Sequence, residues 1–130
     1  MRKIIAALLL IVGVIHLLPL AGVVGADRLA ALYGIRIDEP DLVILMRHRA
    51  VLFGLLGAFL CYAAFHPLLQ PLALIGGFAS VLSFLWFAWS TGGYNPMVGR
   101  VVMADVIALA CLIVAAVLYA LDRSSRLASR

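Results

Sequence analysis

Four long apolar runs constrain the fold of this chain more than any other feature. They cover residues 4–24, 44–65, 72–90 and 101–121. Each run is close to the roughly 20 residues that a helix needs to cross a bilayer, and a helix satisfies its own backbone hydrogen bonds in lipid. Of the 130 residues, 66% are hydrophobic and only 12% are charged, so little sequence remains for a soluble domain. The chain is therefore predicted to be all-α: an integral membrane four-helix bundle in which residues 1–130 form a single transmembrane domain.

The segments between the runs carry signals of their own. In DRLAALYG, after the first run, leucines recur at helical spacing and a glycine follows, which predicts a short amphipathic helix on the membrane surface between the first two spans. Pro40 suits the first turn of the second span. The stretch TGGYNPMVGR, before the fourth run, has the composition of a turn.

Basic residues near the two ends predict the orientation. Arg2 and Lys3 precede the first span, and three arginines follow the fourth: Arg123, Arg126 and Arg130. By the positive-inside rule both termini are expected in the cytoplasm. The rule is not cleanly obeyed, because five arginines fall on the outer side: Arg28, Arg36, Arg47, Arg49 and Arg100.

The first run has some features of a signal peptide, since two basic residues precede it and Val-Gly-Ala near its end resembles a cleavage site. Its length, and the presence of His16 and Pro19 inside it, favour a retained first span instead.

Charge and cysteine usage exclude several classes of function. The net charge of +4 comes from basic residues that flank apolar segments, which is typical of topology signals and headgroup anchors, so no nucleic-acid binding is expected. Cys61 and Cys111 lie inside apolar runs and form no CxxC motif. No metal motif is present, and no metal or cofactor is expected.

Three consecutive polar residues open the second span, in ILMRHRAVLFG. Because each helical residue turns about 100°, Arg47, His48 and Arg49 cannot share a face. Arg47 lies on the side of a small-residue ladder that admits a close helix, formed by Ala50, Gly54, Ala58 and Cys61. Arg49 falls beside Phe53, on a face expected to contact lipid, where its side chain would reach headgroup phosphates. We therefore expect Arg47→Ala to be severe and Arg49→Ala to be mild.

Asp105 is the one acidic residue well inside a span, and it needs a partner there. The second and fourth spans are expected to run in the same direction, so Arg47 and Asp105 would enter the membrane from the same side at similar depth. The sequence predicts an ion pair between them, and leaves open whether the pair is structural or functional.

Other polar residues converge on the same region. His16 lies in the first span, and three serines lie on one stripe of the third: Ser80, Ser83 and Ser90. His16 either bonds to a neighbouring serine or carbonyl or contacts a ligand. Together these spans predict an outward-facing polar pocket with five candidate ligand-binding residues: His16, Arg47, His48, Ser83 and Asp105.

The combination of HLLPL, LYGI, RHRAVLFGLLGA and an aspartate early in the fourth span resembles a family of small uncharacterised bacterial four-helix inner-membrane proteins. Some members carry the name phosphopantetheine adenylyltransferase. That activity needs a soluble nucleotide-binding α/β domain with an HxGH motif, which this chain lacks, so the name is a misassignment. The architecture is more loosely similar to DoxX-like proteins. The resemblance implies the bacterial inner membrane as location and no established activity.

Three functions follow as hypotheses. The first is a binding protein for a small amphipathic or anionic ligand, such as a lipid headgroup or a quinone. The second is a membrane-embedded enzyme, an isomerase or oxidoreductase that uses His16 or Asp105, although no catalytic residue can be assigned. The third is a small proton-coupled exporter. Membrane lipid is an expected partner, and a homo-oligomer is left open.

Overall fold

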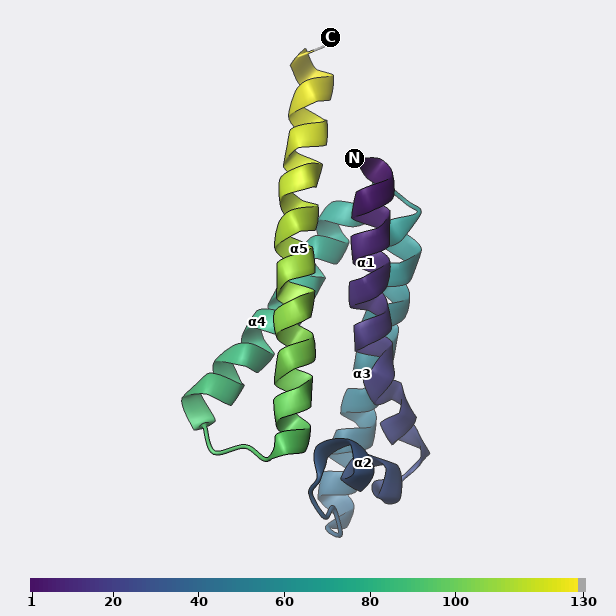
Figure 1. The fold of residues 1–130 in the computed structure, drawn as a ribbon. Helices are drawn as coiled ribbons and strands as arrows, with labels where there is room; N and C mark the ends of the chain where they lie inside the picture. Colours follow the sequence, from purple (N-terminus) through teal and green to yellow (C-terminus); the bar gives the residue numbers. More distant parts are fainter. Residues whose placement is uncertain (129–130) are drawn as a thin grey trace.

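The computed structural model describes residues 1–128, and every regular element in that range is a helix. The elements are α1 (Arg2–Leu17), the 3₁₀ helix η1 (Leu18–Val24), α2 (Ala26–Tyr33), α3 (Pro40–Ala64), α4 (Gln70–Thr91) and α5 (Pro96–Ala128) (Figure 1). The 4 segments long and apolar enough to cross a membrane are α1 with η1, α3, α4 and α5. The predicted all-helical class, four long apolar helices and short intervening helix are confirmed.

A proline shapes the first long segment. Pro19 has no N–H, and its ring would collide with the carbonyl of Ile15, four residues earlier. The chain tightens at this point, because the Leu18 N–H bonds to Ile15 O, three residues back, and η1 follows. The result is one continuous apolar segment, Arg2–Val24, whose last turns are 3₁₀.

Glycines bring α1 and α3 into backbone contact. A Cβ added to Gly57 would lie 2.8 Å from Gly13 O, and one added to Gly13 would lie 2.5 Å from Cys61 Sγ. The small-residue ladder of α3 therefore packs on α1 and η1 through Ala50, Gly54 and Gly57, all buried. The expected ladder residue Ala58 is instead exposed, because the buried stripe advances by three residues from Gly54 to Gly57.

The bundle core lies where α1, α3, α4 and α5 converge, at the end that carries both termini (Figure 1). Fully buried side chains there include Ile5, Leu9, Leu60 and Leu112. Figure 1 shows α4 inclined to the other long helices, so that its C-terminal end diverges from α1 and α3. Trp86 and Trp89, near that end, are exposed.

A second, smaller cluster forms at the opposite end, beneath α2. Leu29, Tyr33 and Ile37 are buried there against α3 and α5. The predicted glycine stop is confirmed: Gly34 ends α2 with φ 65°, a left-handed conformation that costs a glycine little.

Helix α5 begins earlier than the apolar run suggested. Asn95 accepts a hydrogen bond from the Val98 N–H at 2.9 Å through its side chain, and Pro96 occupies the first helical position. The expected turn over residues 91–100 is therefore confined to its first half, and Arg100 lies on α5. The helix also continues beyond the apolar run to Ala128 and projects past the bundle (Figure 1).

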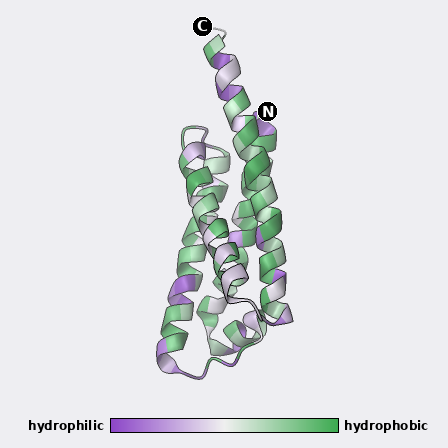
Figure 2. Cartoon of the chain, turned by 90° about the vertical axis from the view of Figure 1, so that its left-hand side faces the viewer, coloured by the Kyte–Doolittle hydropathy of each residue, from purple (hydrophilic) through white to green (hydrophobic). Residues whose placement is uncertain are grey.

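Hydropathy follows this architecture. Figure 2 shows hydrophobic residues along most of the long helices and hydrophilic residues mainly towards the two ends. Many large apolar side chains face outward, among them Ile44 and Leu55. Such a surface is far larger than the apolar patches of soluble monomers, and lipid would cover it at little cost.

Candidate functional site

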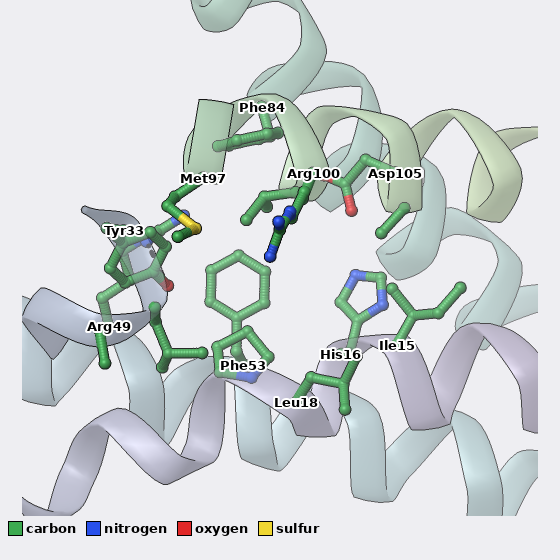
Figure 3. A pocket seen from close by; sticks show the side chains of 15 residues that line it. Ile15, His16, Leu18, Tyr33, Arg49, Phe53, Phe84, Met97, Arg100 and Asp105 are labelled. Atoms are coloured by element: carbon green, nitrogen blue, oxygen red, sulfur yellow. Dashed lines mark hydrogen bonds between the residues drawn. The ribbon is translucent and has the colours of Figure 1, made fainter. Parts of the chain in front are cut away.

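A cavity of about 280 Å³ opens at the α2 end of the molecule, among all four long segments. Apolar and aromatic side chains form most of its wall, and the polar lining residues are His16, Tyr33, Arg49, Arg100 and Asp105 (Figure 3). His16 comes from α1, Tyr33 from α2, Arg49 from α3, and the other two from α5. The site therefore exists only in the folded bundle, because no single helix carries more than two of its polar groups.

Arg49 is held at one side of this cavity. Its Nη1 donates a hydrogen bond to the Tyr33 hydroxyl at 3.1 Å. Its guanidinium lies 4.8 Å from the ring centroid of Phe53, 5.4 Å from that of Tyr33 and 5.9 Å from that of Phe84. Cation–π attraction fixes the planar group among these three rings, while its other N–H groups form no hydrogen bond with residues 1–128.

Arg100 supplies a second guanidinium to the same cavity. It is exposed overall and lies on the stripe of α5 that lines the cavity, with Met97, Val101, Ala104 and Asp105. Figure 3 shows its side chain directed into the cavity, between Phe53 and Asp105. Within the described chain it forms neither an ion pair nor a hydrogen bond, so its five donors are open to a ligand.

Asp105 is 6% exposed, and its carboxylate lies on the cavity wall. It accepts no hydrogen bond and forms no ion pair within 4.0 Å among residues 1–128, yet none of its side-chain atoms is both fully buried and unsatisfied. Its oxygens therefore reach the cavity itself. A carboxylate in such a place can receive a hydrogen bond from a bound molecule.

His16 is buried, and both of its ring nitrogens have partners. Nδ1 lies 2.9 Å from Val12 O, and because a carbonyl only accepts, Nδ1 carries the proton. In the neutral ring Nε2 is then the acceptor, and the Ser80 hydroxyl, 3.1 Å away, donates to it. The ring also stacks on Phe53, with centroids 5.7 Å apart. The prediction that His16 bonds to a neighbouring serine or carbonyl is confirmed, because its ring bonds to the Val12 carbonyl and to the Ser80 hydroxyl.

Of the five predicted ligand-binding residues, the structure brings His16 and Asp105 to the cavity and leaves the other three outside its lining. Arg47 is exposed, and its Nε donates to Val23 O at 2.9 Å. His48 is exposed on the outside of α3. Ser83 is also exposed, and its hydroxyl donates to Ser80 O.

The predicted ion pair between Arg47 and Asp105 is not formed among residues 1–128, where Arg47 bonds to Val23 O instead. The small-residue face of α3 does pack closely, but its neighbours there are α1 and η1, and Asp105 is on α5. Arg47 therefore meets the backbone of η1. The adjacent face of α3, which carries Arg49 and Phe53, looks towards α4 and α5.

The predicted lipid exposure of Arg49 is wrong for the same reason. On its face Leu60 is fully buried in the core and Phe53 lines the cavity. The periodicity of α3 correctly placed Arg47 and Arg49 on different faces. It did not predict that the Arg47 face packs against α1 and η1 and the Arg49 face lies towards α4 and α5. Arg100 could have been found from the sequence, because Met97, Arg100, Val101, Ala104 and Asp105 follow the i, i+3, i+4, i+7, i+8 spacing of one helix face.

Within residues 1–128, no group of three or more His, Cys, Asp or Glu side chains could hold a metal ion. The polar groups that line the cavity are suited to organic ligands instead. The two guanidiniums match carboxylate or phosphate oxygens, and the aromatic rings match an apolar body. No family model, curated protein or solved structure matches this chain.

Proposed function

We propose that this chain is a membrane protein that binds a small amphipathic molecule with an anionic polar group in the cavity beneath α2. The observation that carries the proposal is the pair of arginines, Arg49 and Arg100, which two different helices direct into one largely apolar cavity that also holds Asp105. The guanidinium of Arg49 is partly buried among aromatic rings, where it needs oxygen acceptors, and the described residues supply one, the Tyr33 hydroxyl.

The membrane setting rests on the four apolar helices. Both termini lie at the same end of the bundle, opposite α2 (Figure 1). Since Arg2, Lys3, Arg123 and Arg126 lie at that end, the positive-inside rule favours a cytoplasmic position for it and an outer position for the cavity. The proposed location is the bacterial inner membrane, as the resemblance of RHRAVLFG and its companion motifs to small inner-membrane proteins implies.

Charge selects among the ligands. The lining holds two arginines and one aspartate, which leaves one positive charge if Asp105 is ionised and His16 is neutral. A ligand with a single negative charge neutralises that excess. A hydroxyl or ammonium group on the ligand could donate to Asp105, whose oxygens lack a protein donor.

The apolar lining selects the other half of the ligand. Phe53, Phe84 and Met97 surround the space beside the guanidiniums. About 280 Å³ holds a headgroup and the beginning of an alkyl chain, and it is near the lower limit of ordinary ligand pockets. An anionic lipid headgroup fits this combination better than a quinone, which would leave the one excess positive charge of the lining uncompensated.

The hydrogen bonds of His16 support binding over proton transfer. Both ring nitrogens are engaged, by Val12 O and the Ser80 hydroxyl, so the ring has no free nitrogen to offer a substrate. His16 joins α1 to α4 through Ser80 and stacks on the ring of Phe53, which is a structural role.

The test is to purify the protein in a mild non-ionic detergent and to identify bound molecules by native mass spectrometry. We expect a stoichiometric anionic lipid on the wild type and its loss from the double variant Arg49→Gln, Arg100→Gln. The single variants Arg49→Gln and Arg100→Gln are compared with Arg47→Gln as the matched control, because it also removes one positive charge, two residues from Arg49 but outside the cavity lining.

Equal loss from Arg47→Gln would mean that general charge, and not this cavity, retains the lipid. A bound quinone that survives in the double variant would overturn the anionic ligand class.

A further inference from the structure

A second cavity, also of about 280 Å³, lies at the opposite end of the molecule, beside the termini. It is formed by the start of α1, the turn between α3 and α4, and the last turns of α5. Its polar lining consists of Arg2, Gln70, Tyr119, Asp122, Arg123 and Arg126. None of these residues contributes to the cavity beneath α2.

Asp122 organises the charges of this second cavity. Its Oδ2 lies 3.9 Å from Arg2 Nε, and it also pairs with Arg126, one turn further along α5. One carboxylate thus holds two arginines from the two terminal helices beside the opening. Arg123 adds a third arginine to the lining, beside the one carboxylate.

Gln70 shows that the cavity is built with a polar floor. The residue is 3% exposed, and its Nε2 donates only a long hydrogen bond, 3.5 Å, to Ala64 O. No side-chain polar atom within residues 1–128 is both fully buried and without a partner, so the rest of this amide is turned to the cavity it lines. An amide there offers a donor and an acceptor beneath the arginines.

The rim of the cavity is apolar. Leu68 is 94% exposed and Leu127 is 66% exposed, and both line the opening. Phosphate oxygens suit the arginines and the Gln70 amide, while acyl chains suit the leucines. A free phosphate would use the first set of groups and leave the second in water.

We infer that this second cavity binds the phosphate group of an anionic phospholipid from the leaflet at the end that carries both termini. The inference is independent of the ligand proposed for the cavity beneath α2, because the two sites share no residue and lie at opposite ends of the helices.

The test measures binding of dioctanoyl phosphatidylglycerol to the full chain in a non-ionic detergent, by native mass spectrometry over a lipid titration. Arg123→Gln is the informative variant, because Arg123 is exposed and its replacement should not disturb folding. We expect its affinity for this lipid to fall about tenfold, as for the loss of one charge-assisted hydrogen bond. Arg28→Gln, which removes the same charge from α2 at the opposite end, is the control and should bind as the wild type does.

Two further probes separate the sources of the phosphate. Dioctanoyl phosphatidylcholine, whose headgroup has no net charge, should bind at least about tenfold more weakly than phosphatidylglycerol. Inorganic phosphate at millimolar concentration should not displace the lipid. The inference is overturned if the two lipids bind equally, if Arg28→Gln weakens binding as much as Arg123→Gln, or if free phosphate competes as well as the lipid does.

Discussion

The Arg49 Nη1 donates a hydrogen bond to the Tyr33 hydroxyl across 3.1 Å, and this contact joins α3 to the short helix α2. Tyr33 is also fixed through its backbone, because the Asn95 Nδ2 donates to Tyr33 O at 2.8 Å. Helix α2 is thereby attached to both α3 and the start of α5. The part of the cavity wall that α2 forms is therefore fixed to the bundle by hydrogen bonds.

Removing that hydroxyl tests the attachment. Tyr33→Phe keeps the ring beneath Arg49 and deletes only the acceptor, so we expect a loss of about 1 kcal/mol of stability. Thermal unfolding of the purified protein in detergent measures it. Tyr94→Phe is the control, because the Tyr94 hydroxyl has no partner within residues 1–128 and its side chain is exposed. Equal shifts for the two variants would show that the hydroxyl of Tyr33 contributes nothing specific.

The structure reverses the expected order of stability losses for the two arginines of α3: Arg49→Ala should destabilise the protein more than Arg47→Ala. Arg49→Ala removes a hydrogen bond and contacts with three rings, for which we expect a loss of about 1 to 3 kcal/mol. Arg47→Ala removes one exposed hydrogen bond to Val23 O and should cost less than about 1 kcal/mol. Unfolding midpoints of the two variants in the same detergent decide the order. A larger loss for Arg47 would restore the original assignment of the inward face.

These two residues also mark the limit of what the sequence could predict. The lengths of the apolar runs, Pro40 and the glycine after Tyr33 predicted the helices and two of their boundaries, because those signals act within a few residues. Which faces meet depends on the crossing of helices distant in the chain. The small-residue ladder of α3 predicted a close neighbour but could not say whether it was α1 or α5.

The sequence predicted only part of the candidate site, because local signals identify single residues but not the contacts between helices. His16 and Asp105 were found because a polar group within an apolar run is conspicuous by itself. Arg100 was placed in a turn, since NPMVGR has the composition of one, yet Asn95 and Pro96 are also good starting residues for a helix. Once α5 begins at Pro96, Arg100 and Asp105 share a face, and the second guanidinium of the cavity follows.

The hydrogen bond between His16 and Ser80 should stabilise the junction of α1 and α4. Ser80→Ala leaves Nε2 of a buried ring without its donor, at an expected cost of about 1 to 3 kcal/mol. Ser83→Ala is a close control, because the Ser83 hydroxyl bonds only to the Ser80 carbonyl and the residue is exposed. Unfolding midpoints should separate the two serines. If Ser83→Ala is as damaging as Ser80→Ala, then the stripe of serines stabilises α4 itself and the contact with His16 has no special part.

The backbone contact between α1 and α3 gives the last prediction. A Cβ on Gly57 would lie 2.8 Å from Gly13 O and 3.0 Å from Leu17 N, and neither backbone atom can move without α1 moving with it. Gly57→Ala should therefore separate α1 from α3 and cost about 1 to 3 kcal/mol, even though alanine favours the helix. Gly76→Ala is the matched control, because the one atom near its added Cβ is Leu56 Cδ1 at 3.4 Å, an ordinary contact with a flexible side chain. There the helix propensity of alanine should dominate, and stability should stay the same or rise by up to about 1 kcal/mol. Unfolding midpoints of the two variants, measured in one detergent, would contradict the backbone contact between α1 and α3 if Gly57→Ala were as stable as Gly76→Ala.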